Sequence, residues 1–215
     1  MKAPLILIGG GGHCKSCIDV VEQEGCYAIA GILDKPELVG TQLLDYPIIG
    51  TDEEIARLAE NHHFLIAVGQ IKSPATRLAI YAKLKEAGAK MATIVSPRAY
   101  LSAHARLGEG SIVMHGATVN ACAIIGNNCI INSHALVEHD AVIHDHCHIA
   151  TGAIVNGDAE IGAGSFIGSR TMVRERVTIG EQAVVGGGNT VLSDIPSHTQ
   201  LKLREQYETK NFYYR

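Results

Sequence analysis

Histidine and acidic side chains gather in one stretch of the chain, between Asn132 and His148. His139 is followed directly by Asp140, whose carboxylate can accept a hydrogen bond from one imidazole nitrogen and favour the protonated ring. An imidazole that is paired in this way and lies in a cleft can accept a proton from a reacting group, as a general base. The sequence therefore offers His139 and Asp140 as a candidate catalytic pair.

The same stretch allows two other interpretations. His144, His146 and His148 alternate along the chain, and alternating residues of a strand share one face, so they could hold a zinc ion as in a γ-class carbonic anhydrase. The chain contains 11 histidines, and accidental pairs of solvated histidines are expected at that number.

Cys14 and Cys17 form a lone CxxC without the second pair that a zinc site needs, and we expect reduced thiols.

A glycine-rich loop is the second candidate for chemistry. Residues Gly9–His13 follow the apolar run Leu5–Ile8 and precede residues with helical spacing. Consecutive glycines allow close approach of the backbone, and a helix N-terminus favours phosphate. The loop has only the first half of a dinucleotide-binding fingerprint, and the alternative is a plain tight turn. Asp34, at the end of the next strand-like run, could bind a ribose or a base.

The elements that would position this loop alternate between strand and helix over residues 1–94. We predict strands and helices in turn at Leu5–Ile8, 14–24, Ala28–Leu33, Asp52–Glu60 with Thr51 as N-cap, Phe64–Val68, Pro74–Ala87 closed by Gly88, and Met91–Val95. This βαβ alternation indicates a Rossmann-like α/β domain with a small parallel sheet.

A six-residue repeat begins at Val95. An aliphatic residue occupies every sixth position as far as Val191, a small residue commonly lies two places before it, and glycine follows it at 108, 126, 162, 168, 180 and 186. This periodicity predicts an all-β left-handed parallel β-helix, in which three hexads make one triangular coil. The aliphatic residues would fill the interior, and Gly or Asn would occupy the corners. Because Val137 points inward, His139 can point outward.

The repeat ends in a polar stretch at Ser193. We therefore expect an α/β domain at 1–94, a β-helix at 95–195 and a C-terminal tail at 196–215. In the tail, Leu201–Lys210 could form a helix, and Phe212, Tyr213 and Tyr214 could pack on a neighbouring surface.

Composition and charge exclude several classes of function. The net charge of −4 and the absence of a basic run argue against a nucleic-acid partner. The run Leu5–Ile8 is too short for a signal peptide or a membrane span, so we expect a cytoplasmic protein without a membrane partner.

Several of these motifs together resemble a known family, over nearly the whole chain to about Ser193. The residues that carry the resemblance are Ile8–His13, Leu33-Asp34, Ala67-Val68-Gly69, Ile131-Asn132 and Val137-Glu138-His139-Asp140. The chain resembles the hexapeptide-repeat sugar-nucleotide acetyltransferases of the sialic acid O-acetyltransferase and bacillosamine or perosamine N-acetyltransferase group. It departs from that group at Ile195–Thr199, where relatives commonly carry Gly-x-Pro-Ala-Lys near the coenzyme.

The resemblance implies a role for each matching residue. His139 would be the general base, and Asp140 would raise its basicity. His148 would hydrogen-bond the thioester region of acetyl-CoA, and Asn132 would help to hold the pantetheine arm or the substrate. Backbone groups of Ser169 and Gly187 would contact coenzyme A. The nucleotide of the sugar substrate would be bound by Gly11, Gly12, His13, Asp34, Lys35 and Gly69.

The expected reaction is N-acetylation, by acetyl-CoA, of the 4-amino group of a UDP-linked 4-amino-4,6-dideoxy sugar of the bacillosamine type. Such a reaction serves glycan synthesis, for example of lipopolysaccharide O-antigen. No Ser or Cys nucleophile stands with His139 in a triad, so we expect direct transfer without an acyl-enzyme. We also expect a homotrimer, with the coenzyme between two β-helices, and no metal cofactor.

Other functions stay open at this point. The nearest alternatives are the same chemistry on a GDP-linked sugar such as perosamine, and O-acetylation of sialic acid. From a different class, a zinc-dependent hydratase and a non-catalytic β-helical scaffold are also compatible with the repeat.

Overall fold

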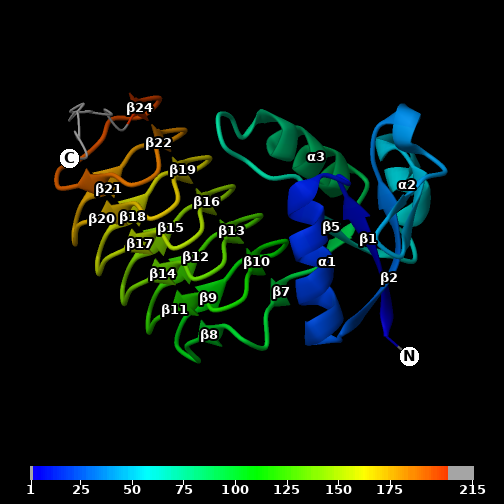
Figure 1. Cartoon of the computed structure of the whole chain (residues 1–215), viewed down its shortest axis with the longest axis horizontal. Coiled ribbons are helices and arrows are strands. Elements are labelled where there is room, and N and C mark those ends of the chain that lie inside the picture. Colours follow the sequence, from blue (N-terminus) through cyan, green and yellow to red (C-terminus); the bar gives the residue numbers. More distant parts are fainter. Residues whose placement is uncertain (1, 203–215) are drawn as a thin grey trace, which may run out of the picture.

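A computed structural model describes residues 2–202, in which an α/β part precedes a column of short strands (Figure 1). The α/β part contains, in chain order, β1 (Ala3–Ile8), α1 (Gly12–Glu24), β2 (Tyr27–Leu33), the 3-10 helix η1 (Pro36–Leu38), β3 (Gln42–Leu43), β4 (Tyr46–Gly50), the 3-10 helix η2 (Asp52–Glu54), α2 (Ile55–Leu58), β5 (His63–Ile66), α3 (Ala75–Glu86) and β6 (Lys90–Met91).

The six strands form one sheet in the order β3-β4-β2-β1-β5-β6. All neighbours run parallel except β3 and β4. Helix α1 covers one face and packs between that sheet and the β-helix, whereas α2 and α3 cover the other face (Figure 1). Parallel strands that carry helices on both faces are buried on both sides, and Leu5, Ile6, Leu7 and Ile8 of β1 are accordingly inaccessible to solvent. The predicted α/β fold is confirmed.

The column of short strands begins at β7 (Ile94–Val95). It continues with β8 (Tyr100–Leu101), β9 (Arg106–Leu107), β10 (Ile112–Val113), β11 (Thr118–Val119), β12 (Ile124–Ile125), β13 (Ile130–Ile131), β14 (Leu136–Val137), β15 (Val142–Ile143), β16 (His148–Ile149), β17 (Ile154–Val155), β18 (Glu160–Ile161), β19 (Phe166–Ile167), β20 (Met172–Val173), β21 (Thr178–Ile179), β22 (Val184–Val185), β23 (Thr190–Val191) and β24 (Gln200–Leu201).

These strands make three parallel sheets of seven, six and five strands, as the six-residue repeat predicts. The seven-stranded sheet runs from β7 through β16 to β24, the six-stranded sheet contains β14, and the five-stranded sheet contains β15. The periodic aliphatic residues and the small residues before them form one continuous core inside the prism. The left-handed β-helix is therefore confirmed, and its seven-stranded sheet faces the α/β part through Ile94, Ile112 and Ile130.

The corners of the prism differ in one detail from the expectation. The glycines directly after the aliphatic residues serve close stacking: a Cβ at Gly108 would lie 2.5 Å from the carbonyl carbon of Gly126 in the next coil. The left-handed backbone occurs two residues later, and Gly110, Asn128 and Asp140 all have positive φ there. Non-glycine residues at such positions are strained unless the fold holds them.

The last coil also differs from the expectation, because the chain does not leave the β-helix at Ser193. Leu201 pairs with Val185, sixteen positions away, whereas Val185 pairs with Ile167 at the usual eighteen. The corner between Val191 and Ile195 is two residues shorter than the others, so the six-residue spacing is lost in the sequence although the coil continues. The proposed helix Leu201–Lys210 extends beyond the described residues, and Phe212, Tyr213 and Tyr214 lie outside them. The domain limits at 94/95 and 195/196 stay predictions.

Three features of the α/β part were not predicted as they occur. The hairpin of β3 and β4 lies in a segment to which the sequence assigned no element. The helix expected at Asp52–Glu60 is shorter and begins as η2, although Thr51 caps it as predicted, by accepting a bond from the Glu53 amide. The strand expected at Met91–Val95 is split between β6 and β7.

The cysteines, all within residues 2–202, are free thiols as expected.

Candidate functional site

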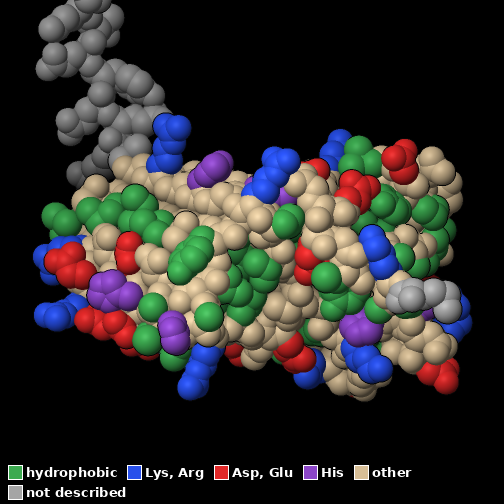
Figure 2. All heavy atoms as spheres, turned by 90° about the horizontal axis from the view of Figure 1, so that it is seen from below, with side chains coloured by type: hydrophobic (Ala, Val, Ile, Leu, Met, Phe, Trp, Pro, Cys, Tyr) green, Lys and Arg blue, Asp and Glu red, His purple; other side chains and the backbone are tan. Residues whose placement is uncertain are grey.

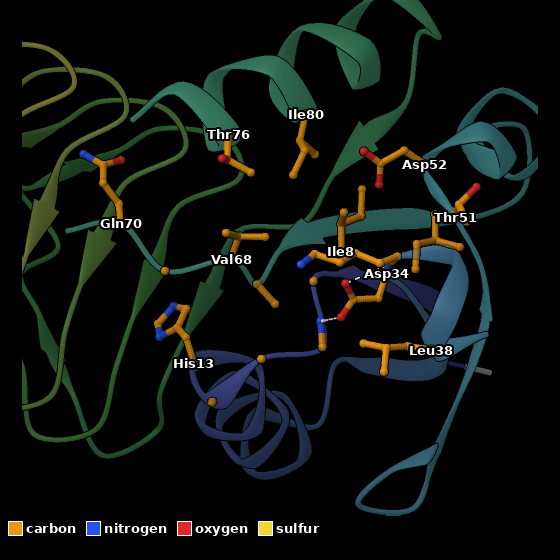
Figure 3. A pocket seen from close by; sticks show the side chains of 18 of the residues that line it. Ile8, His13, Asp34, Leu38, Thr51, Asp52, Val68, Gln70, Thr76 and Ile80 are labelled. Carbon is orange, nitrogen blue, oxygen red and sulfur yellow. Dashed lines mark hydrogen bonds between the residues drawn. The ribbon is translucent and has the colours of Figure 1, made fainter. Parts of the chain in front are cut away.

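A cavity of about 990 Å³ lies at the carboxyl edge of the α/β sheet (Figure 3). In open parallel sheets, ligands bind outside the carboxyl ends of the strands, where the connecting loops diverge. The walls come from the ends of β1, β2, β4 and β5, from α3 and from β16 of the β-helix. Seven residues that the sequence singled out line it together: Gly11, Gly12, His13, Asp34, Lys35, Gly69 and His148.

The glycine loop lies at the centre of this cavity. Gly9 has a φ of +98°, and a Cβ there would lie 2.4 Å from the Val68 side chain, so this position requires glycine. A Cβ at Gly11 or Gly12 would meet nothing within 4 Å. Packing therefore does not explain these two glycines, which leave the N-terminus of α1 open to the cavity. The Cys14 amide donates to the Gly11 carbonyl at 3.1 Å, whereas the two N–H groups before it have no carbonyl partner within the helix and favour an anion.

Asp34 supports the loop from the end of β2. Its Oδ2 accepts a hydrogen bond from the Gly10 amide at 2.6 Å, and its Oδ1 accepts one from the Lys35 amide at 2.8 Å (Figure 3). Each carboxylate oxygen keeps a second acceptor site. Asp34 can therefore hold the loop and still accept a hydrogen bond from a hydroxyl group of a ligand.

His13 points into the cavity from the start of α1 (Figure 3). Burial, followed by the nearby His148 and Arg77, lowers the pKa of His13 to about 4, so the ring is neutral near pH 7. Among residues 2–202, its buried Nε2 has no hydrogen-bond partner. A buried polar atom without a partner is costly, and a ligand in the cavity can supply the missing bond.

His148 closes the end of the cavity that faces the β-helix. Its ring is 6% exposed and packs edge-on against Phe166. Burial lowers its pKa to about 4. Since a carbonyl can only accept, Nδ1–H donates to the Gln70 carbonyl at 2.6 Å, and Nε2 accepts from the Asn132 amide at 3.0 Å. Both nitrogens of His148 are therefore engaged within the chain.

A buried arginine fixes the loop that carries Gly69 and Gln70. Arg77 of α3 is 1% exposed, and it donates to the carbonyls of Ile66 and Val68 at 3.0 and 2.8 Å. Its other terminal nitrogen binds the carbonyl and side-chain oxygens of Asn128, on a corner of the β-helix. Arg77 thus joins α3, the cavity loop and the β-helix at one point.

The residues predicted to contact coenzyme A lie along one edge of the β-helix. Asn132, Ser169 and Gly187 all lie on the corner that joins the seven-stranded and six-stranded sheets, with Ser169 and Gly187 on successive turns and Asn132 two turns before Ser169. The Gly188 amide donates to the Ser169 carbonyl at 2.8 Å, which stacks two of these turns. His148 lies in the adjoining sheet and is bonded to Asn132, so this edge leads directly to the cavity.

The candidate catalytic pair has the geometry expected of it. His139 Nδ1 lies 2.8 Å from Asp140 Oδ2 on an exposed corner, and the hydrogen bond to Asp140 raises the pKa of His139. The charges of Asp140, Glu138 and Asp158 act in the same direction. A Cβ at Gly157 would lie 2.8 Å from His139 Cε1, so the glycine leaves space for the ring.

This pair does not line the cavity of its own chain. His139 lies on the corner between the six-stranded and five-stranded sheets, whereas the α/β part packs on the seven-stranded sheet. That corner is the one opposite the packed face of the triangular prism. The body of the β-helix therefore separates His139 from His148 within one chain.

The other histidines of the stretch have separate partners. His144 Nε2 lies 2.6 Å from Glu160 Oε1, and His146 binds Asn128 and packs edge-on against Tyr81. Among residues 2–202, no three His, Cys, Asp or Glu side chains are grouped as they would be to hold a metal ion.

Several lining residues were not singled out by the sequence. Gln70 and Asp52 lie at opposite ends of the cavity, while Thr76, Ile80 and Lys83 line it from one face of α3 (Figure 3). Their spacing of four and three residues is visible in the sequence, but it is also the ordinary spacing of a helix face. Gln70 and Asp52 could have been found from their position shortly after the parallel strands β5 and β4.

Comparisons with known proteins match both parts of the chain. The model of the PglD N-terminal domain matches residues 4–84, and that of the bacterial transferase hexapeptide (six repeats) matches residues 104–139 and 158–193. No curated protein matched the chain. Within residues 2–202, no helix has the length and apolar character needed to cross a membrane.

Solved structures similar to the chain cover nearly all of it. A histidine-to-asparagine mutant of perosamine N-acetyltransferase from Caulobacter crescentus, in complex with CoA and GDP-perosamine, is 30% identical, with a TM-score of 0.86 and 92% of each chain covered. The acetyltransferase domain of PglB from Neisseria gonorrhoeae, in complex with acetyl coenzyme A, is 29% identical, with a TM-score of 0.86, over 93% of this chain and 96% of that one. WeeI from Acinetobacter baumannii, 24% identical with a TM-score of 0.83 over 93% and 96% of the two chains, shows the fold.

Proposed function

Because the chain belongs to the PglD-type family of acetyl-CoA-dependent nucleotide-sugar N-acetyltransferases with hexapeptide repeats, we propose that it acetylates the 4-amino group of a nucleotide-linked 4-amino-4,6-dideoxy sugar. The observation that carries this proposal is the cavity that runs from Asp34, past the glycine loop, to His148 on the β-helix. It offers one continuous site for a nucleotide and a sugar, and it ends where the coenzyme edge begins.

The nucleotide lies along the sheet edge in this proposal. Its diphosphate binds at the N-terminus of α1, where Gly11 and Gly12 allow close approach, and Lys35 adds positive charge. The Asp34 carboxylate accepts a hydrogen bond from a ribose hydroxyl, as acidic residues at the end of a second strand do in nucleotide-binding folds. The amino sugar then extends past His13 toward His148.

His139 acts as the general base in this reaction. Its Nδ1–H is directed to Asp140, which leaves Nε2 free to accept a proton. As the neutral amine attacks the thioester carbonyl, a C–N bond forms and the proton of the attacking nitrogen passes to Nε2. The C–S bond then breaks, and the sulfur of coenzyme A takes the proton held on Nε2 of the His139 imidazolium and leaves as the thiol. No acyl-enzyme is required.

The thioester oxygen needs a hydrogen-bond donor while it carries negative charge. We assign that role to Asn132, because its amide has two N–H groups and only one is directed to His148. His148 itself has no free N–H when its single proton is directed to Gln70. We therefore propose that His148 positions Asn132, in place of the direct thioester contact that the resemblance implies.

A second copy of the chain has to complete this site. His139 and the cavity lie on opposite sides of one β-helix, so the base must come from a neighbouring subunit. Apolar side chains gather along the β-helix on the face shown in Figure 2, and Tyr100, Ile124 and Leu192 are exposed in that part of the chain. We propose a homotrimer, with coenzyme A along the edge of Asn132, Ser169 and Gly187 between two subunits.

A direct assay tests the proposed reaction. The protein is incubated with acetyl-CoA and a panel of UDP- and GDP-linked 4-amino-4,6-dideoxy sugars, and the release of free thiol is followed. We expect thiol release that depends on the sugar, and an acetylated product that survives mild base because it is an amide. Thiol release without an amide product, or no release with any 4-amino sugar, would contradict the proposal.

A further inference from the structure

The end of the cavity remote from His148 carries a pair of opposite charges. Asp52 follows β4 at the carboxyl edge of the sheet, and Lys83 reaches it from α3. Lys83 Nζ lies 3.5 Å from Asp52 Oδ2, and both side chains are partly accessible to solvent. An exposed pair of this kind contributes little to stability. Breaking this ion pair therefore costs little free energy, and each side chain can bind a ligand instead of its partner.

This end of the cavity is where a nucleobase must lie if the proposed nucleotide site is correct. The diphosphate is placed at α1 and the ribose at Asp34, so the base extends away from His148. Leu38 and Ile80 stand on opposite sides of the space there, and the Asp52 carboxylate is turned toward it (Figure 3). Two apolar walls and a charged pair at the edge suit a flat ring with a polar rim.

The hydrogen-bonding rims of the bases differ in what they present to such a pair. Guanine offers two adjacent donors, N1–H and the 2-amino group, beside the acceptor O6. A carboxylate accepts both donors at once, and an ammonium group next to it donates to the oxygen. Uracil offers only one donor, N3–H, between two carbonyl oxygens. One oxygen of the carboxylate could accept from N3–H, but the other would lie against a carbonyl oxygen. Adenine and cytosine present a ring nitrogen acceptor in place of the donor.

We infer that the nucleotide of the substrate carries guanine, with Asp52 accepting from N1–H and the 2-amino group and Lys83 donating to O6. This inference rests on the proposed function, because it assumes that the cavity holds the nucleotide of the sugar donor. It reverses the order of preference expected from the sequence, which put a UDP-linked sugar first.

Calorimetric titration of the full chain with free nucleotides tests the inference without turnover. We expect GDP to bind about 5- to 150-fold more tightly than UDP, which is the fold-change that corresponds to the about 1–3 kcal/mol of a bidentate contact to a base. Inosine diphosphate lacks only the 2-amino group and should bind with intermediate affinity. Asp52→Asn should abolish the difference between GDP and inosine diphosphate and reduce the preference over UDP.

A matched control and a second variant accompany this titration. Glu54→Gln removes the charge of another acidic side chain of η2, which pairs with Arg57 outside the cavity, and it should leave the preference unchanged. Lys83→Met should weaken GDP and inosine diphosphate equally, because both present O6. Equal or tighter binding of UDP by the parent protein would overturn the inference, and so would a GDP preference over UDP that is undiminished in Asp52→Asn.

The outcome for the base is separable from the outcome for the reaction. If a UDP-linked amino sugar is acetylated faster than its GDP-linked counterpart, the reaction stands and the guanine inference falls. If GDP binds with the expected selectivity but no amino sugar is acetylated, the base inference stands and the proposed reaction falls.

Discussion

His148 donates a hydrogen bond from Nδ1 to the carbonyl oxygen of Gln70 at 2.6 Å, and this bond joins the β-helix to the loop that lines the cavity of the α/β part. The same ring accepts a bond from Asn132 on the edge assigned to coenzyme A. One neutral imidazole therefore contacts both sides of the proposed acyl transfer. The bond from Asn132 requires an unprotonated Nε2, so His148 can make both contacts only while the ring is neutral.

The free energy of unfolding should therefore fall in mild acid. The pKa of His148 is about 4 in the folded chain, below its ordinary value near 6.5, and the pKa of His13 is lowered likewise. Between these values the unfolded chain binds protons that the folded chain excludes, so stability is lost as pH falls from about 6.5 toward 4. His148→Gln keeps a donor and an acceptor but does not titrate. Denaturant unfolding at several pH values should show a shallower slope for this variant, and an unchanged slope would contradict the assignment.

Arg77→Met should destabilise the fold by about 3 kcal/mol or more. The change leaves the carbonyls of Ile66 and Val68 and the polar groups of Asn128 buried without their donor, and unpaired buried acceptors are costly. Denaturant unfolding measures the difference. Arg57→Met is the matched control: its exposed pair with Glu54 should be worth less than about 1 kcal/mol. Similar unfolding midpoints for the two variants would argue against Arg77 as the link between the two parts.

Asp140→Asn should shift the pH dependence of turnover. The hydrogen bond to Asp140 is the largest cause that raises the pKa of His139, and a general base must be unprotonated to act. The acid limb of kcat in the parent protein should therefore lie above the ordinary histidine value near 6.5, and it should move to lower pH in Asp140→Asn. Turnover at its plateau should also fall, because a weaker base remains. A limb that does not move would remove Asp140 from the proposed role.

Much of the fold follows from local periodicity, which the sequence displays directly. The spacing of six residues from Val95 fixed the prism, its core and the outward direction of His139, because each hexad contacts mainly its own neighbours in the stack. The shortened corner after Val191 hid the last coil, since two missing positions destroy the period without disturbing the pairing of Leu201 with Val185.

The cavity was predictable in part. Its glycine loop and Asp34 are marked by residue type and by their place after strands. The bonds that Arg77 donates to Asn128, 51 residues away, and that His148 donates to Gln70, 78 residues away, were not predictable. Each joins a side chain to a backbone carbonyl of a segment that only the packing of the two parts brings near. The separation of His139 from the cavity was hidden for the same reason.

The proposed base is tested most directly by turnover of His139→Ala with acetyl-CoA and the preferred nucleotide-linked amino sugar, both saturating. His144→Ala is the matched control, because His144 is also exposed and paired with a carboxylate, that of Glu160. We predict that His139→Ala lowers kcat by about 10²–10⁴-fold while nucleotide binding is retained, and that His144→Ala leaves kcat unchanged. Turnover of His139→Ala equal to that of the parent protein would contradict the assignment of His139 as the general base.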